Sequence, residues 1–388
     1  MRNTLICTVG TSLFESNLRK IDDESIEKLK ILGNIKEAFE NQNWALLAKH
    51  MQKIDPKDRF CGAEINTIEE ARKKNNFALE KIFFLVSDTE DGKNTGKFLV
   101  KYYSMRKDLN LKESNINYIP VRDLQDKNPK KFKIHGLRNL VREIGKIVKD
   151  YGEKQVVIDA TGGYKAQIAI AVIVGQALDI PVYYKHERFS EIIDFVPLPI
   201  VLNYDFLGKY STLFNDLEQV EDNIIDEDEL RNYVIEERDL EKIKIFLDEE
   251  LIDGKNYYGL NAIGQLYLDS FRLRMPKIID LPELKENERE EPTFRDDHYP
   301  DGFKEFFKKV WSENKWIKTC KTLPYNKQKS IKGIGFYIFY DGNEKKLVGT
   351  YVGKNNFGAR FGIILSKENE DNLNYAVDLL NTKYRKKN

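Results

Sequence analysis

The sequence predicts an α/β protein with a parallel sheet in its first half, followed by an acidic segment and a smaller basic domain. Three observations support this prediction. Short β-rich apolar runs alternate with longer helical patterns over residues 1–205. Residues 206–281 and 294–388 differ in charge, and a charged, proline-bounded stretch at 282–293 separates them. A chain of 388 residues is long enough for two or three domains with their own cores.

The alternation over residues 1–205 predicts a Rossmann-like parallel sheet covered by helices. The expected strands are Thr4–Val9, Lys81–Ser87, Ile116–Val121, Gln155–Ala160, Pro181–Lys185 and Ile192–Val196. The last two are short and close together, so we expect an antiparallel pair at the sheet edge. Tyr164–Leu178 is apolar almost all round, which predicts a buried helix.

Residues 206–281 resemble a small winged-helix unit. Leu240–Leu251 and Asn261–Phe271 are expected to be helices, with a hairpin over Leu251–Leu260 between them. A DNA-binding face needs cations, yet residues 211–293 hold 10 Lys and Arg against 23 Asp and Glu. We therefore expect a spacer or dimerisation role, and a ligand-controlled winged-helix DNA-binding regulator remains the alternative.

Residues 294–388 predict a compact α+β domain. Its expected helices are Gly302–Trp311 and Asn374–Leu380, and its expected antiparallel strands are Gly335–Tyr340, Leu347–Val352 and Arg360–Leu365. This segment has 19 Lys and Arg against 11 Asp and Glu. The positive balance suits a polyanionic partner such as RNA.

Composition excludes several classes of protein. The sequence has no apolar run long enough to span a bilayer and no signal-peptide pattern after Met1-Arg2. We therefore expect a cytoplasmic protein without a membrane partner. Cys7, Cys61 and Cys320 are far apart and odd in number, which argues against a disulfide framework and a cysteine-based zinc site. No metal and no cofactor is expected.

Two glycine turns predict an anion or nucleotide site. One follows the first expected strand and the other follows the fourth, at the start of the apolar helix. Ligands of open α/β sheets bind off the carboxyl ends of the strands, where glycines let backbone N–H groups approach an anion. Neither turn is a Walker A loop or a GxGxxG fingerprint. The candidate ligand-binding residues are Gly10, Thr11, Ser12, Leu13, Asp88, Thr89, Thr161, Gly162, Gly163 and Lys165.

Residues 1–205 contain six separated motifs in a fixed order: Cys7–Leu13, Ala63–Asn66, Ser87–Thr89, Gly136–Leu140, Thr161–Gln167 and Tyr183–Phe189. In these motifs the segment resembles the CARF sensor domains of type III CRISPR systems. The resemblance implies a homodimer that binds cyclic oligoadenylate, commonly cyclic tetra-adenylate, in a groove lined by Gly10–Leu13 and Thr161–Lys165. It leaves open whether the domain also cleaves its ligand, with Ser12 or Lys165 positioning a 2′-hydroxyl.

Residues 295–388 contain Arg295–Tyr299, a helix with Trp311, Thr322–Asn326 and a basic stretch before three strands. With these motifs the segment resembles a RelE-type mRNA interferase. The resemblance implies a metal-independent endoribonuclease, activated by the sensor, that cleaves mRNA on ribosomes and holds the scissile phosphate with Lys and Arg. The candidate catalytic residues are Lys329, Lys332, Arg360 and Lys367. Related domains place an arginine after the last strand, where this sequence reads Ser366-Lys367-Glu368.

A metal-dependent nuclease is the competing enzyme class. Such a site needs an acidic residue and an ExK motif on adjoining strands, to hold a divalent ion and activate water. Glu283-Leu284-Lys285 matches the letters of that motif, with Asp280 close by in sequence. The motif falls in the charged linker, which disfavours this alternative.

Overall fold

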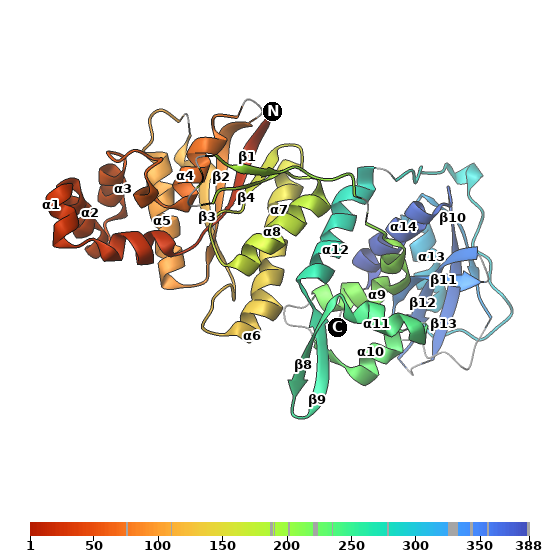
Figure 1. Ribbon diagram of the computed structural model, residues 1–388. Coiled ribbons are helices and arrows are strands. Elements are labelled where there is room, and N and C mark those ends of the chain that lie inside the picture. The colour runs from red at the N-terminus through yellow and green to blue at the C-terminus, as the bar shows by residue number, and fades with distance from the viewer. Residues whose placement is uncertain are drawn as a thin grey trace. The chain divides into compact units, whose positions relative to one another are not determined.

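The computed structural model describes residues 1–74, 77–109, 111–186, 189, 191–200, 202–219, 224–234, 236–277, 279–324, 333–341, 344–354 and 357–385. The chain forms two compact units (Figure 1). Unit 1 comprises Met1–Val201 and Asn261–Ser270, and unit 2 comprises Leu202–Leu260 and Phe271–Asn388. In the described part of the chain, no helix is long and apolar enough to cross a membrane.

Unit 1 contains a sheet in the order β3-β2-β1-β4-β5-β6. Its strands are β1 (Arg2–Thr8), β2 (Phe77–Ser87), β3 (Ile116–Val121), β4 (Val156–Asp159), β5 (Val182–Tyr184) and β6 (Ile193–Phe195). All neighbours pair in parallel except β5 and β6, which pair antiparallel. The predicted α/β class, the parallel sheet and the antiparallel edge pair are therefore confirmed.

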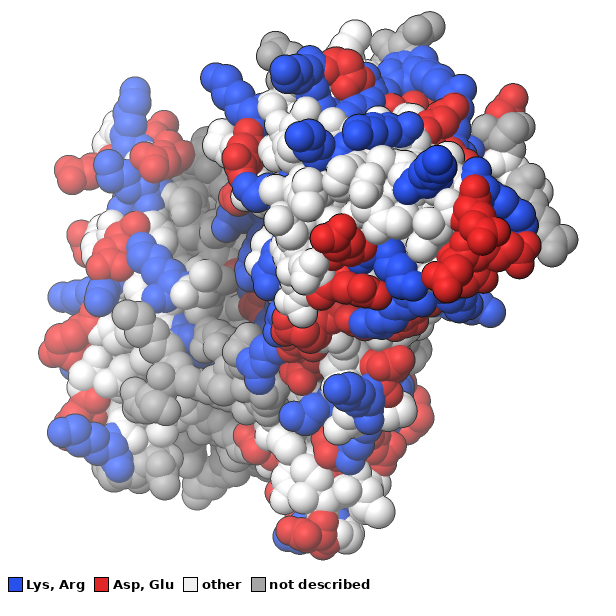
Figure 2. All heavy atoms as spheres, turned by 90° about the vertical axis from the view of Figure 1, so that its left-hand side faces the viewer, with Lys and Arg blue, Asp and Glu red and all other residues white. Residues whose placement is uncertain are grey.

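Helices cover both faces of this sheet (Figure 1). They are α1 (Asp23–Lys28), α2 (Ile31–Glu40), α3 (Trp44–Met51), α4 (Ala63–Ala71), α5 (Glu90–Ser104), α6 (Pro129–Lys131), α7 (Leu137–Tyr151) and α8 (Lys165–Leu178). Leu5 and Cys7 of β1 pack into one core with residues of α2 to α5. Basic and acidic side chains are interspersed over the end of unit 1 that carries α1 and α2 (Figure 2), where Lys28 pairs with Glu24.

The prediction that α8 is buried on all sides is wrong for this chain. Gln167, Ala171 and Val174 are buried, whereas Ala169 is exposed and Ile173 is 44% exposed. A single layer of helices covers each face of a sheet, so the outer face of such a helix stays open unless another element packs on it. Among the described residues, the outer face of α8 is therefore an exposed apolar surface.

Unit 2 contains a four-stranded antiparallel sheet in the order β10-β13-β12-β11 and a three-stranded sheet in the order β7-β9-β8. The strands are β7 (Ile224–Asp226), β8 (Leu247–Ile252), β9 (Lys255–Leu260), β10 (Ile317–Thr322), β11 (Gly335–Asp341), β12 (Glu344–Val352) and β13 (Gly358–Leu365). The helices are α9 (Asp205–Gln219), α10 (Glu227–Tyr233), α11 (Leu240–Lys244), α12 (Ala262–Arg274, whose first part belongs to unit 1), α13 (Phe303–Glu313) and α14 (Glu370–Tyr384).

The sequence predicts separate domains over 206–281 and 294–388. Residues 206–260 and 271–281 of the first lie in the same unit as residues 294–388. Helix α9 packs against α14 and β11. Arg272 of α12 donates to Glu218 of α9 and to Asp378 of α14, and Arg385 donates to Asp216 of α9. These partly buried ion pairs join α9 to the C-terminal segment, through Arg272 as a bridge between Glu218 and Asp378 and directly through Arg385 and Asp216.

The predicted helix over Leu240–Leu251 is wrong in its second half. Helix α11 ends at Lys244 and β8 begins at Leu247. From Leu247 to Ile252, each residue of β8 pairs with β9. The ladder satisfies the backbone groups that a longer helix would have satisfied internally, so the tertiary pairing decides the local conformation.

Candidate functional site

The strand order of unit 1 reverses between β1 and β4. β2 and β3 lie on one side of β1, and β4, β5 and β6 lie on the other. Ligands of open α/β sheets bind outside the carboxyl ends of the strands at such a point. Cys7 of β1 pairs with Asp159 of β4, so the turns at Gly10–Leu13 and Thr161–Lys165 leave neighbouring strand ends. The structure brings these two predicted segments together.

The side chain of Glu64, in α4, contacts both turns. This side chain is 1% exposed, and its Oε1 accepts a hydrogen bond from the Gly10 N–H at 2.8 Å. A Cβ at Gly162 would lie 2.1 Å from the same oxygen, and a Cβ at Gly10 would lie 2.8 Å from the nitrogen of Gly163. Both positions require glycine because the carboxyl group and the two backbones are in direct contact.

Threonine and aspartate side chains fix the second turn. Asp159 Oδ1 accepts a hydrogen bond from the Thr161 N–H at 3.0 Å. Thr67 Oγ1 donates to Thr161 Oγ1 at 3.0 Å, and Thr8 Oγ1 donates to the Gly162 carbonyl at 2.6 Å. Thr8, Thr67 and Asp159 are fully buried. The turn is therefore held in one conformation without a ligand, which lowers the entropic cost of binding.

The groups beneath the turns are acidic and buried. Burial raises the pKa of Asp159 to about 7, and the neighbouring Glu64 acts in the same direction. Burial also raises the pKa of Glu64, against the opposing hydrogen bond from Gly10. The Cys7 thiol donates to Asp159 Oδ2 at 3.4 Å, and burial raises its pKa well above the usual range. These shifts favour neutral forms, which limits negative charge beneath an anion site.

Residues at the start of α8 provide positive potential and hydrogen-bond donors at the candidate site. Lys165 is the first residue of α8, is exposed, and has no carboxylate partner among the described residues. Gly163 has a φ of 101°, which turns the chain into the helix. The buried Gln167 accepts from the Tyr164 N–H through Oε1, while its Nε2 has no hydrogen-bond partner. The exposed Ser12 precedes the first turn of η1 (Leu13–Asn17). A helix N-terminus with a free lysine and an unused amide donor suits an anion.

Three predicted ligand residues have structural roles in unit 1. Thr89 caps α5, since its Oγ1 accepts from the Gly92 N–H at 3.0 Å. Asp88 forms an ion pair with Lys93 at 2.9 Å, which, together with a hydrogen bond from the Asp123 N–H, lowers its pKa despite partial burial. Leu13 is 1% exposed and belongs to the hydrophobic core. Its side chain is therefore not available to a ligand, and its carbonyl accepts from the Leu18 N–H.

Sequence reasoning missed the residues that support the site. Glu64 lies in a motif quoted for the family resemblance, yet nothing in its spacing indicates contact with Gly10. Asp159 gives a clearer signal, because a carboxylate that ends the apolar run Val156–Ile158 must find a partner when buried. Gln167 is equally visible as the single strongly polar residue between Ala166 and Gly175.

The predicted catalytic residues of unit 2 divide into two groups. Lys329 and Lys332 lie outside the described residues. Arg360, near the start of β13, donates to the Pro324 carbonyl at 3.1 Å. Lys367 follows the opposite end of that strand and pairs with Asp280. From Arg360 to Leu365 the strand alone spans about 17 Å, at ~3.3 Å per residue. The structure therefore does not bring Arg360 and Lys367 together.

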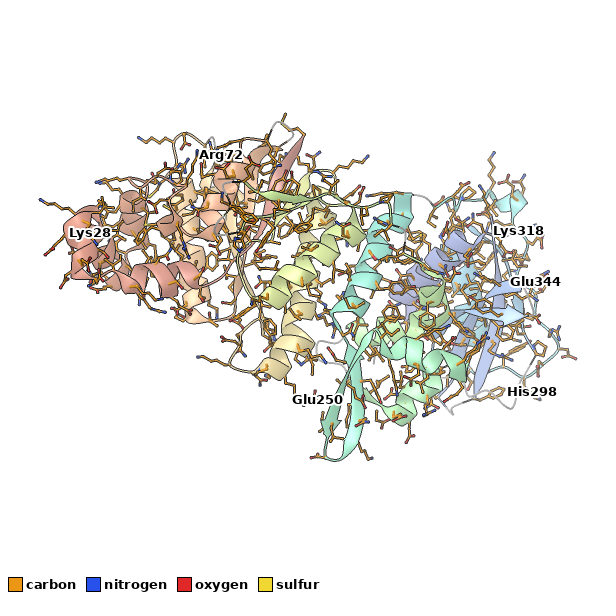
Figure 3. All side chains as sticks on the ribbon, viewed as in Figure 1. Lys28, Arg72, Glu250, His298, Lys318 and Glu344 are labelled. Atoms are coloured by element: carbon orange, nitrogen blue, oxygen red, sulfur yellow. The ribbon has the colours of Figure 1, made fainter. Side chains whose placement is uncertain are left out.

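A tyrosine accompanies Arg360. Burial raises the pKa of the Tyr337 hydroxyl, and the positive charge of the neighbouring Arg360 opposes that shift. Tyr337 lies on β11 and Arg360 on β13, on either side of β12. His298, another ionisable group of unit 2, is exposed in the loop before α13 (Figure 3). An arginine beside a tyrosine can hold a phosphate and exchange a proton with it.

The ExK motif does not lie on a strand. Lys285 precedes the short η8 (Glu286–Glu288), and the Leu284 N–H donates to the Lys315 carbonyl. No group of three or more His, Cys, Asp or Glu residues that could hold a metal ion occurs among the described residues. The geometry that a carboxylate-bound divalent ion needs is therefore not found at Glu283.

The fold defines an α/β protein with a candidate anion or nucleotide site where its strand order reverses. Residues 59–200 match the model of a family described as CRISPR-associated protein (Cas_APE2256). No curated protein matches the chain. Among solved structures, the chain is similar to Can2 from Sulfobacillus thermosulfidooxidans in complex with cyclic tetra-adenylate, with a TM-score of 0.26 and 8% identity. That match covers 71% of this chain and 63% of Can2.

Proposed function

We propose that unit 1 is a type III CRISPR ancillary sensor that binds a cyclic oligoadenylate, cyclic tetra-adenylate being the ligand to test first. The observation that carries this proposal is the pair of glycine turns at the β1 and β4 ends, fixed from below by Glu64 and Asp159. Lys165 and the N-terminus of α8 supply positive potential for phosphates. The match of residues 59–200 to a CRISPR-associated family agrees with this assignment.

The open face of α8 supports the further proposal that the chain forms a homodimer. Ile173 is 44% exposed, and Val196 and Leu198 are 68% and 60% exposed. Gln176 of α8 accepts from the Leu198 N–H at 2.9 Å, so the helix and this segment form one apolar surface. A second copy would cover it by two-fold symmetry. Lys165 lies on the same helix, so two copies would place two lysines around one ring.

Unit 2 is proposed to be a RelE-like, metal-independent endoribonuclease that cleaves mRNA on ribosomes. Arg360, with Lys329 and Lys332, would hold the scissile phosphate, and Tyr337 would exchange a proton with the 2′-hydroxyl or the leaving oxygen. The surplus of Lys and Arg in residues 294–388 favours an RNA substrate. Ligand binding activates the enzyme only if the ring binds the active state more tightly.

Calorimetry with Lys165→Ala tests the sensor. Loss of a charged hydrogen bond should cost about 1–3 kcal/mol, or about 5- to 150-fold in Kd for cyclic tetra-adenylate. Lys146→Ala is the matched control, because Lys146 is an exposed lysine of α7 that pairs with Glu143. Equal affinities of wild type and Lys165→Ala would contradict the assignment.

Cleavage mapping tests the effector. The full chain is incubated with translating ribosomes and with naked RNA, each with and without cyclic tetra-adenylate. We expect ligand-dependent cuts that leave 2′,3′-cyclic phosphates, and a loss of about 10- to 1,000-fold in rate for Arg360→Ala. Abolition of naked-RNA cleavage by EDTA would instead favour the metal-dependent nuclease. Ligand-dependent binding of duplex DNA without cleavage would favour the winged-helix regulator.

A further inference from the structure

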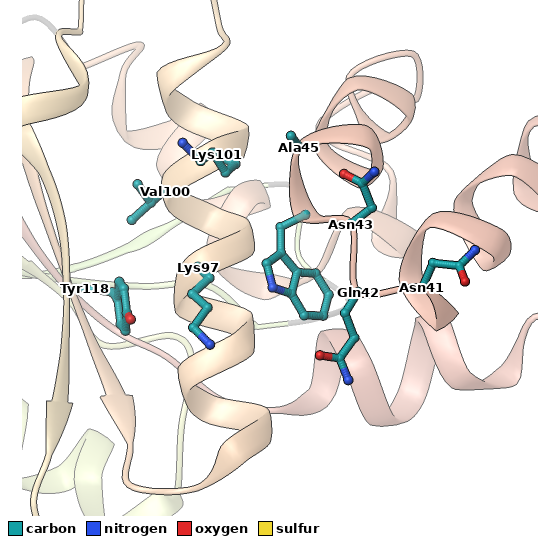
Figure 4. Close-up of a pocket in the computed structure, with 9 residues that line it drawn as sticks. Asn41, Gln42, Asn43, Ala45, Lys97, Val100, Lys101 and Tyr118 are labelled. Atoms are coloured by element: carbon teal, nitrogen blue, oxygen red, sulfur yellow. The ribbon is translucent and has the colours of Figure 1, made fainter.

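Unit 1 has a pocket between α5 and the turn that joins α2 to α3 (Figure 4). Its volume is about 610 Å³, within the range of small-molecule sites. None of its lining residues belongs to the two glycine turns. They are Asn41, Gln42, Asn43, Trp44, Ala45, Lys97, Val100, Lys101 and Tyr118. The lining combines aromatic rings, amides and lysines.

Core packing fixes the aromatic rings of the pocket. The Trp44 ring stacks on Phe14 with centroids 5.5 Å apart and an interplanar angle of 25°, and it is tilted against Phe39. The Tyr118 ring lies against α5 at Gly96, where a Cβ would come within 2.8 Å of it. Trp44 and Tyr118 remain partly exposed. Held aromatic rings of this kind bind planar heterocycles at low entropic cost.

The charge of the pocket favours an anion. Lys97 and Lys101 line it, and no described Asp or Glu does. Lys101 is neutralised by Glu113, whose Oε1 lies 2.6 Å from its Nζ. Lys97 donates to the neutral Asn94 Oδ1 at 3.0 Å and has no carboxylate partner in the described part of the chain. Of the two lining lysines, Lys97 is therefore the one whose positive charge is available to bind a ligand.

The turn offers amides that can read the edge of a base. Asn43 Oδ1 is committed to the Leu46 N–H at 3.1 Å. The side chains of Asn41 and Gln42 are exposed and form no hydrogen bond with the described residues. Gln42 has a φ of 52°, a conformation that costs a non-glycine residue free energy. In Figure 4, the side chains of Gln42 and Lys97 extend toward the same side of the pocket between the turn and α5.

We infer that this pocket is a binding site for an adenine mononucleotide, separate from the proposed cyclic-ligand groove. The base stacks on Trp44, an Asn or Gln amide pairs with adenine N6 and N7, and Lys97 holds the phosphate. A side-chain amide presents one donor and one acceptor, which matches that edge of adenine and mismatches guanine. Lys97 favours the nucleotide over the nucleoside, because only the nucleotide carries a phosphate.

Titration of the full chain with AMP, followed by tryptophan fluorescence, tests the site. We expect saturable quenching that Trp44→Phe removes, since Trp311 and Trp316 lie in unit 2. Lys97→Met should raise the Kd for AMP about 10- to 100-fold and leave the weaker binding of adenosine unchanged. Lys146→Met, which removes an exposed lysine elsewhere in unit 1, should bind AMP as wild type does.

An unchanged Kd in Lys97→Met would overturn the inference. Displacement of AMP by inorganic phosphate at equal concentration, or equal affinity for GMP, would also overturn it. Lys97 is partly exposed, so Lys97→Met keeps the test independent of any folding defect in Trp44→Phe. AMP binding that is lost in Lys165→Ala but kept in Lys97→Met would place the nucleotide in the groove and refute the separate site. Calorimetry with cyclic tetra-adenylate tests the groove independently of these results.

Discussion

Asp159→Asn should change how the stability of unit 1 depends on pH. The buried carboxyl has its pKa raised to about 7 from an ordinary value of 3.8. Below that ordinary value both the folded and the unfolded state are protonated. Between about pH 4 and pH 7 the folded state keeps a proton that the unfolded state releases, so the free energy of unfolding falls as pH rises. Above about pH 7 the buried carboxyl is charged in the folded state, and the free energy of unfolding is lowered by the full amount that corresponds to the pKa shift.

The magnitude follows from the pKa shift. Each tenfold change in proton affinity corresponds to about 1.36 kcal/mol, so the raised pKa amounts to about 4 kcal/mol of pH-dependent stability. Asparagine cannot ionise, keeps an acceptor for the Thr161 N–H, and places its amide beside the Cys7 sulfur. The free energy of unfolding of Asp159→Asn minus that of the wild type should therefore increase by about 4 kcal/mol from pH 4 to pH 8.

Urea unfolding at a series of pH values measures this difference. Circular dichroism follows the transition, and native-state hydrogen exchange of the β4 amides assigns it to unit 1. Asp150→Asn, at an exposed position near the end of α7, is the control and should show a constant difference from wild type. A constant difference for Asp159→Asn as well would refute the view that this carboxyl is held neutral in the folded protein.

Further substitutions test the site, the dimer and unit 2. Gly162→Ala should weaken cyclic tetra-adenylate binding and lower the melting temperature, because its Cβ would lie 2.1 Å from Glu64 Oε1. In Gly33→Ala, with 3.5 Å to its nearest neighbour, both should remain close to wild type. Ile173→Asp should yield monomers in sedimentation. The control Ile245→Asp, which replaces an exposed isoleucine of unit 2, should remain dimeric. Dimers of Ile173→Asp would contradict the α8 interface. Asn381→Ala should cost about 1–3 kcal/mol in urea unfolding, because it leaves the buried N–H and carbonyl of Phe336 unpaired. A loss below ~0.5 kcal/mol would show that water replaces the amide.

Local sequence determined the strands of unit 1 and the placement of its two glycine turns. Short apolar runs predict β1 to β6 within a few residues at each end. The signal is clearest for β1 and β4, because strands buried on both faces must be apolar. Glycines directly after β1 and β4 predict an anion site because only glycine permits such close backbone approach. These features depend on neighbours in the chain, so they can be read without the tertiary structure.

Tertiary structure decided what covers, pairs or supports these elements. The apolar composition of α8 does not reveal that Ile173 is left open, and the helical pattern after Lys244 is overridden by pairing of β8 with β9. Glu64 and Asp159 support the two turns only because strand order brings α4 and β4 beneath them. Arg360 and Lys367 are close in sequence, but an extended strand carries them apart. Contacts between distant segments depend on the packing of the whole chain, and residue type and spacing do not encode them individually.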